Sequence, residues 1–350
     1  MKGLPRNFPW CEWRGGIRVF IAVTFLFAPL LTSAATVDTY AQLTGKTVLA
    51  PFALPSVTGS SPELPKNKTN AIALLEQEFS KMGISVVQDG PCFVRLVPTG
   101  ERQADTGWMP FGGAQLHASA SQQLMPAGTV NFLATDANQV LEIYADLKGR
   151  TILRSRILPA PTIHFKTQCP LTREELVYAL ETVLALNGLG AVDDGHFVQI
   201  VPIRLRSMIT PHAPTPQPGD KLFDPKKVPS MGYSNPRPQT KLERDLERWE
   251  KAFFEFMRLN GTRNSSAQHL LELYAGLTDK RAEPSKDYET SPIWFHVRTP
   301  LTRSELLYAI ETTFALNNLE IAAGEENKIR LGPRMGPGKG VPAMHETRGQ

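Results

Sequence analysis

The chain has 350 residues, of which 41% are hydrophobic and 21% charged, and its net charge is +4. This length and composition are ordinary for a globular protein of two or three domains with cores of their own. The charge is too small to require nucleic acid as a partner. The 29 prolines cluster along the chain, which indicates linkers between small units.

The N-terminus has the order of a secretory signal peptide. Basic residues recur between Lys2 and Arg18, an apolar run occupies residues 19–31, and small residues stand at 33–35. We therefore predict a signal peptide over 1–35 and a protein exported to the periplasm or cell envelope. The apolar run has thirteen residues, fewer than the roughly 20 that span a bilayer. We expect no membrane span after cleavage; a retained signal anchor is the alternative.

One helix is written twice in this sequence. PLTREELVYALETVLALNGL covers residues 170–189, and PLTRSELLYAIETTFALNNL covers residues 300–319, with fourteen of twenty positions identical. Tyr144 and Tyr274 each precede these helices by the same interval of 26 residues. Matched spacing at separated anchors indicates a duplicated unit. A more diverged first copy is expected ahead of both.

The repeats and the stretches between them divide the chain. We predict a signal peptide (1–35), a degenerate repeat (36–98), a linker (99–128), a second repeat (129–203), a proline-rich linker (204–240), a linker helix (241–260), a third repeat (261–333) and a disordered tail (334–350). The first repeat is expected to lack its first strand and most of its first helix. The proline-rich linker is expected to stay outside any core.

The second repeat shows the expected order of elements. These are a strand at 129–132, a helix at 136–149, strands at 150–158 and 161–167, a helix from Thr172 to Gly188, and a hairpin at 190–202. Thr172 and Glu175 have capping-box spacing, and Asn318 stands at the place of Gly188 in the third repeat. The prediction is an α+β fold made of three small β-α-β-β-α-β-β repeats joined by linkers. A unit this small is marginal alone and gains from packing on neighbours.

These residues resemble a known family. The stretch from VNFLATDANQVLEIYADLKGRTIL to HFVQIVP, within residues 130–202, is similar to the small periplasmic domains at the N-terminus of bacterial secretins. Secretins are the outer-membrane channels of type II secretion and type IV pilus systems, and the signalling domain of TonB-dependent receptors is related. The resemblance implies domains that stack into rings and contact envelope partners. Seventeen residues follow Pro333, too few for the secretin channel domain, so we expect a protein without that domain.

The resemblance implies a non-enzymatic scaffold or accessory in protein secretion or pilus assembly. Its partners would be envelope proteins, namely secretion-system components or further copies of the chain, and not nucleic acid. Tyr178 and Glu181, with Tyr308 and Glu311 in the later copy, are the candidate protein-contact residues, because half-exposed tyrosines favour interfaces. The alternative for each tyrosine is that it covers the core.

The sequence indicates no catalytic, cofactor or metal site. The motifs GxSxG, HExxH and GxxxxGK[ST] are absent. His164 and His296 are expected to be structural, and Asp193 with Asp194 to bond the backbone of a hairpin turn.

The two cysteines beyond the signal peptide fall in different predicted domains. Export permits a disulfide between Cys92 and Cys169. Because the domains differ, we expect two buried thiols.

Two other classes of function stay open. A β-α-β-β-α unit with Arg150, Arg154 and Arg156 is similar to a KH-type nucleic-acid binder, but the GXXG clamp is missing. An exported cell-wall or glycan binding module is the main alternative. Exposed aromatic platforms would support it, and Trp108 and Trp294 are the candidates.

Overall fold

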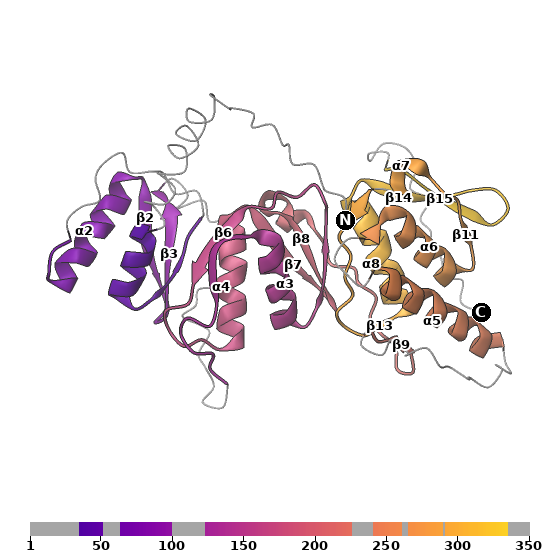
Figure 1. Cartoon of the computed structure of the whole chain (residues 1–350), viewed down its shortest axis with the longest axis horizontal. Helices are drawn as coiled ribbons and strands as arrows, with labels where there is room; N and C mark the ends of the chain where they lie inside the picture. The colour runs from indigo at the N-terminus through magenta and orange to yellow at the C-terminus, as the bar shows by residue number, and fades with distance from the viewer. Residues whose placement is uncertain are drawn as a thin grey trace, which may run out of the picture. The chain divides into compact units, whose positions relative to one another are not determined.

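The computed structural model describes residues 35–51, 64–99, 123–225, 241–260, 265–289 and 291–334 (Figure 1). Its helices and small mixed sheets make an α+β fold, as predicted. The chain divides into two compact units, Met1–Thr135 with Thr162–Leu186, and Asp136–Pro161 with Asn187–Gln350. This division passes through the predicted second repeat.

The first unit contains helices on two small sheets. Its elements are a helix at 35–44, β1 (Thr47–Leu49), α2 (Lys68–Lys81), β2 (Ile84–Asp89), β3 (Phe93–Pro98), β4 (Asn131–Asp136), β6 (Thr162–Lys166) and α4 (Arg173–Leu186). One sheet has the order β1-β3-β2, with β1 parallel and β2 antiparallel to β3; the other pairs β4 with β6. The helix at 35–44 shows that the expected loss of most of this first helix is wrong.

That helix packs into a hydrophobic core of the first unit. Tyr40 is fully buried and packs edge-on against Phe79 of α2, with the ring centroids 5.5 Å apart. Its hydroxyl donates a hydrogen bond to Glu76 Oε1 at 2.7 Å. Leu75 and Val94 belong to the same cluster.

The second unit carries the remaining elements. These are α3 (Ala137–Lys148), β5 (Thr151–Arg154), β7 (Leu189–Asp194), β8 (Phe197–Pro202), η3 (Ile203–Met208), β9 (Leu222–Phe223), α5 (Lys241–Asn260), β10 (Ser265–Ser266), α6 (Ala267–Thr278), β11 (Arg281–Ala282), α7 (Lys286–Glu289), β12 (Pro292–Ile293), β13 (Leu301–Thr302), α8 (Arg303–Leu316), β14 (Leu319–Ala323) and β15 (Lys328–Pro333). The predicted opening strand at 129–132 is observed as β4 at 131–136, in the first unit. The short β10 stands at the corresponding place of the predicted third repeat.

One sheet pattern occurs three times. The sheets β5-β8-β7 and β11-β15-β14 have the order and strand directions of β1-β3-β2. In each, a strand that follows a helix pairs in parallel with the last strand of a hairpin. We call the predicted repeats at 36–98, 129–203 and 261–333 the first, second and third segments. Whether these three segments are copies of one unit stays a prediction.

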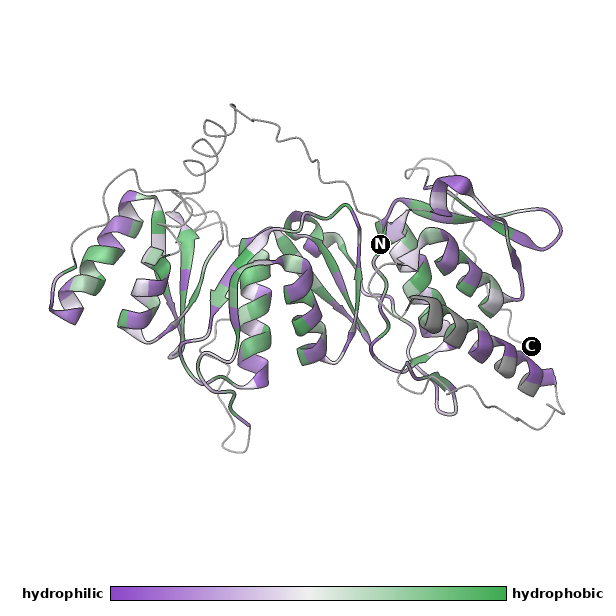
Figure 2. Cartoon of the chain, in the orientation of Figure 1, coloured by the Kyte–Doolittle hydropathy of each residue, from purple (hydrophilic) through white to green (hydrophobic). Residues whose placement is uncertain are grey.

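The predicted helix ends are confirmed. Asp136 accepts a hydrogen bond from Asn138 N and caps α3, and Gly149 ends this helix with φ of 63°. The capping box is complete at the start of α4: Glu175 N donates to Thr172 Oγ1 and Thr172 N to Glu175 Oε2. Figure 2 shows hydrophobic residues along most of α4, in agreement with its many buried positions.

The residues in the left-handed conformation after α2, α4 and α8 also follow the prediction. Gly188 has φ of 83°, Asn318 has φ of 57°, and Gly83 in the first segment has φ of 70°. Glycine, and to a lesser degree asparagine, adopts this conformation at low cost.

The stretch predicted as a proline-rich linker enters the core of the second unit. β9 pairs antiparallel with β13, which buries Phe223 against Phe253 of α5 with ring centroids 5.6 Å apart. The expectation that 204–240 stays outside any core is therefore wrong for Phe223. The predicted helix at 241–260 is confirmed as α5.

Several predictions lie outside the described residues. They concern the signal peptide up to residue 34, most of the linker at 99–128, residues 226–240 and the tail from 335. Within the described ranges, no helix is both long and apolar enough to cross a membrane.

Candidate functional site

Tyr178 of α4 contacts the end of the hairpin in the first segment. Its side chain is 5% exposed and its hydroxyl donates a hydrogen bond to Asp89, the last residue of β2. Its ring centroid lies 5.6 Å from that of Phe93, and Arg95 Nε lies 3.2 Å from Asp89 Oδ2. Burial, and then the bond to Asp89, raises the pKa of Tyr178 above its usual range.

Tyr308 of α8 makes the same contacts in the second unit. Its hydroxyl donates to Asp194, the last residue of β7, and its ring centroid lies 5.8 Å from that of Phe197. Asp194 is 1% exposed and also accepts Gln199 Nε2 at 2.7 Å and Ala213 N at 2.8 Å. Burial, with the bond to Asp194 second, raises the pKa of Tyr308 to about 12.

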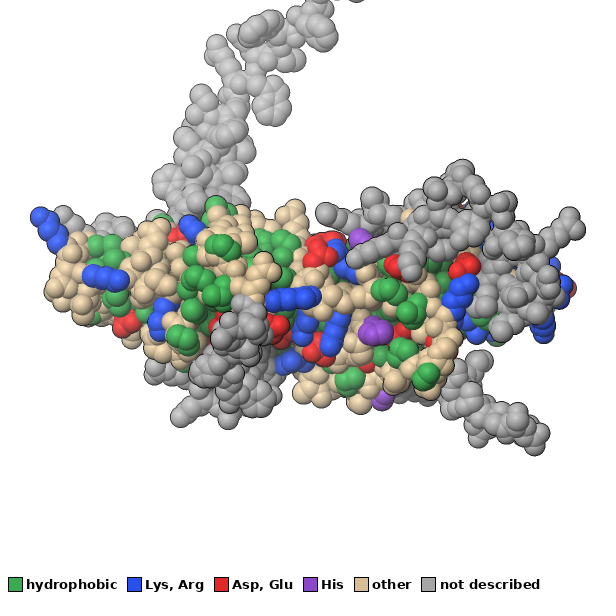
Figure 3. All heavy atoms as spheres, turned by 90° about the horizontal axis from the view of Figure 1, so that it is seen from below, with side chains coloured by type: hydrophobic (Ala, Val, Ile, Leu, Met, Phe, Trp, Pro, Cys, Tyr) green, Lys and Arg blue, Asp and Glu red, His purple; other side chains and the backbone are tan. Residues whose placement is uncertain are grey.

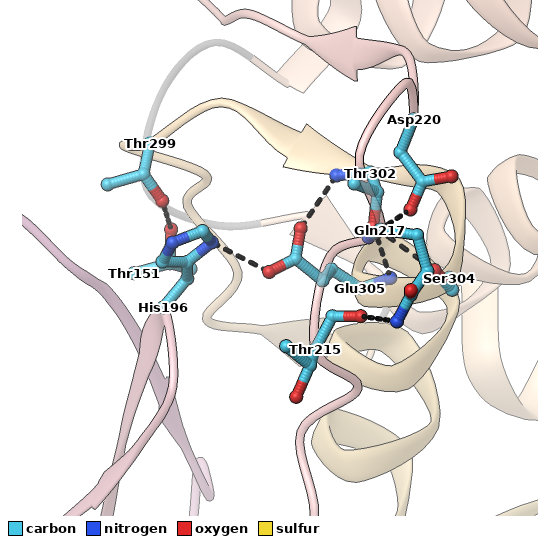
Figure 4. A network of polar contacts seen from close by, with 9 residues as sticks. All are labelled: Thr151, His196, Thr215, Gln217, Asp220, Thr299, Thr302, Ser304 and Glu305. Atoms are coloured by element: carbon cyan, nitrogen blue, oxygen red, sulfur yellow. Dashed lines mark hydrogen bonds and ion pairs between the residues drawn. The ribbon is translucent and has the colours of Figure 1, made fainter.

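A buried threonine provides the second matching contact. In the first unit, Gln168 N donates to Thr47 Oγ1 at 3.0 Å, and Cys169 Sγ lies 3.6 Å from the same oxygen. In the second unit, Arg298 N donates to Thr151 Oγ1 at 3.0 Å. The hydroxyl of Thr299 then lies 3.4 Å from Thr151 Oγ1 (Figure 4).

Strand register establishes that these contacts are equivalent. Thr47 pairs with Phe93 across parallel strands, as Thr151 pairs with Phe197. We define the first junction as the contacts of Thr47, Asp89, Cys92 and Phe93 with Gln168, Cys169 and Tyr178. The second junction is the contacts of Thr151, Asp194, His196 and Phe197 with Arg298, Thr299 and Tyr308. Each junction lies within one compact unit.

The second junction has additional ionic contacts. Glu305, the capping-box glutamate of α8, accepts Thr302 N at 2.8 Å and lies 2.6 Å from His196 Nδ1 through its other oxygen (Figure 4). The guanidinium of Arg298 bonds the carboxylates of Glu142 and Asp146 on α3. The buried Glu305 therefore caps its own helix, α8, and also bonds His196 of the neighbouring hairpin.

The predicted glutamates differ from the tyrosines in their contacts. Glu311 accepts a hydrogen bond from Tyr274 of α6 at 2.7 Å, which repeats the Tyr40–Glu76 bond of the first segment. Glu181 is half-buried on α4. The role predicted for all four residues, contact with another protein, stays a prediction; both tyrosines contact the preceding segment of the same chain.

The acceptors at both junctions, Asp89 and Asp194, were missed in the sequence. Asp194 was expected to bond the backbone of a turn, and this is wrong, because its carboxylate is buried under Tyr308. A recognisable signal was present. Both aspartates end the first strand of a hairpin, Asp89 four positions before Phe93 and Asp194 three positions before Phe197.

The other candidates have structural contacts. His164 Nε2 lies 3.0 Å from Asp38 Oδ1. Arg154 is buried, bonds Asn138 and lies over the ring of Trp294, so it forms no exposed basic strand. On the face drawn in Figure 3, Lys and Arg side chains lie among Asp and Glu side chains. Within the described ranges, no group of three or more His, Cys, Asp or Glu side chains is placed to hold a metal ion.

The aromatic residues considered for glycan binding give little support to that alternative. Trp294 is 8% exposed, so its ring offers no open platform for a sugar. Trp108 lies outside the described residues.

The first and third segments each lack the residues that would form a further junction of this kind. The register of β11 and β15 puts Arg281 and Lys328 at the places of Thr151 and Phe197. The register of β14 puts Gly324 at the place of Asp194. In α2, counted from the N-cap Asn67, Ala73 stands at the place of Tyr178. The third segment therefore has no acceptor for a tyrosine, and the first offers no tyrosine.

Comparison with protein-family models finds no match, and comparison with curated proteins finds none either.

Proposed function

We propose that the chain is a non-enzymatic cell-envelope protein whose small α+β segments serve as protein interaction modules in protein secretion or pilus assembly. One observation carries the proposal. The same helix start and the same tyrosine dock on the same hairpin end at two separate places in the chain. Equivalent residues form the same hydrogen bonds at both places. We take this recurrence as the mark of a recognition surface, because packing alone does not require the same bonds.

The polar groups of the junctions already have hydrogen-bond partners within the chain. Asp194 accepts three hydrogen bonds from protein groups, and Glu305 serves both its own helix and His196. Buried carboxylates of this kind fix how two surfaces meet and leave little capacity for a substrate. This supports assembly over chemistry.

A partner would contact a surface outside the two junctions. The tyrosines are occupied, and the first and third segments lack the groups that would extend the pattern to another copy. We favour two equivalent surfaces, the half-buried side of α4 around Glu181 and the exposed side of α8 around Glu311. Secretion-system components or further copies of the chain are the proposed occupants.

The test combines location with contact. A photo-reactive amino acid replaces Glu181 in cells that express the full chain, and a matched variant carries it at Glu289 on the exposed α7. The proposal expects the protein in the envelope fraction, and cross-links to a secretion component or a second copy from position 181 that position 289 does not give. Retention in the cytoplasm contradicts the proposal. Retention on purified cell-wall glycan without cross-linked protein favours the glycan-binding alternative.

A further inference from the structure

The two cysteines among the described residues meet at the first junction. Cys169, in the loop before α4, donates its thiol hydrogen to the carbonyl oxygen of Cys92 at 3.4 Å, although 77 residues separate the two in sequence. The thiol of Cys92 lies 4.0 Å from the carbonyl oxygen of Pro170, the next residue after Cys169. Each sulfur therefore lies against the backbone at or beside the other cysteine.

The cysteine pair is specific to this junction. Thr47 N donates to the carbonyl oxygen of Cys92, and Thr151 N donates in the same way to His196. His196 and Thr299 thus take the places of Cys92 and Cys169 at the second junction. The shared contacts form without sulfur, so the two cysteines add something that the common docking does not need.

We propose that Cys92 and Cys169 form a disulfide that fastens the first segment to the loop before α4. The oxidant is a disulfide compound or a disulfide-carrying protein. One cysteine thiolate attacks the disulfide of the oxidant, which gives a mixed disulfide and releases one thiol. The second thiolate attacks the protein sulfur of the mixed disulfide, closes the Cys92–Cys169 bond and releases the second thiol. Two protein thiols are oxidised, the oxidant is reduced to two thiols, and the two protons pass to its sulfurs.

The surroundings tolerate the loss of both thiol hydrogens. The carbonyl oxygen of Cys92 still accepts Thr47 N at 2.8 Å, and Thr47 Oγ1 still accepts Gln168 N at 3.0 Å. Both cysteines are half-buried, which leaves a route for an oxidant. Burial, with the bond from Cys169 next, raises the pKa of Cys92 to about 12, so closure by small oxidants is expected to be slow at neutral pH.

The persistence of this bond in the cell rests on the proposed export, because disulfides persist in oxidising compartments. Its formation in the purified protein does not depend on export. The two ideas therefore fail in different experiments.

The test uses the full chain with Cys11→Ser, which leaves two of its three cysteines. Oxidised glutathione should remove both free thiols, and mass spectrometry should find the peptides of Cys92 and Cys169 joined within one chain. The oxidised form should melt roughly 5 °C above the reduced form. Glutathione adducts on both cysteines, or a bond between two chains, would overturn the inference.

Single variants control for folding. Cys92→Ser and Cys169→Ser, each in the same background, should keep the circular dichroism spectrum and lose the gain in melting temperature on oxidation. A gain that survives in either variant contradicts the inference. In cells, rapid alkylation should find both thiols blocked. Free thiols there, with closure in the purified chain, count against the proposed export and leave the inference standing.

Discussion

The hydroxyl of Tyr308 donates its hydrogen to Asp194, which lies 114 residues earlier in the chain. The bond joins the middle of α8 to the end of β7, and Gln199 and Ala213 N complete the bonding of the carboxylate. A hydrogen bond to a charged group contributes more than a neutral one. Tyr308 is therefore where the second junction is most easily tested.

We expect Tyr308→Phe to lower the free energy of unfolding by about 1–2 kcal/mol. The loss should stay in this range because two other donors still serve Asp194. Urea denaturation measures it. Tyr288→Phe is the matched control, since among the described residues its hydroxyl donates to no side chain and it packs against the same core. An equal loss in both variants would show that the bond to Asp194 contributes nothing specific.

The two tyrosine bonds should contribute independently. Tyr178 bonds Asp89 and Tyr308 bonds Asp194, and the two junctions share no partner. The losses of Tyr178→Phe and Tyr308→Phe should therefore add in the double variant to within about 0.5 kcal/mol. A double-mutant cycle by urea denaturation checks this. A larger coupling energy would mean that one junction senses the other.

Stability should fall at alkaline pH. The pKa of Tyr308 is raised from its ordinary value of 10.0 to about 12 by burial and then by Asp194, so the folded protein holds this proton more tightly than the unfolded chain. The contribution is fully present below pH 10 and is lost as the pH rises toward about 12. Ultraviolet titration should show late-ionising tyrosines. Tyr308→Phe should remove one of them, and a titration with ordinary tyrosines alone would refute the buried bond.

From the left-handed conformation of Gly188 after α4, we predict which of two substitutions there lowers the free energy of unfolding more. Its φ is 83°, and a Cβ placed there meets nothing within 4 Å, so strain is the only expected cost. Gly188→Ala should lower the free energy of unfolding by about 1–2 kcal/mol. Gly188→Asn should cost less, because Asn318 holds the equivalent place with φ of 57°. Thermal unfolding compares the two, and equal losses would argue against the left-handed conformation.

The sequence by itself determined the local features of this protein. It identified the α+β class, the capping box at Thr172, and the left-handed residues at Gly188 and Asn318. These features depend on contacts within a few residues, so spacing and residue type suffice to predict them. The helix at 241–260 was also predicted from the sequence and forms as α5.

Only the tertiary structure decided which residues meet across the chain. Asp89 and Tyr178 are 89 residues apart, and Cys92 and Cys169 are 77 apart. No local pattern relates such pairs, because their distance depends on how strands and helices of different segments pack. For the same reason Phe223 entered the core from a stretch that reads as a linker: the pairing of β9 with β13, far along the chain, provides the buried place that proline content alone argues against.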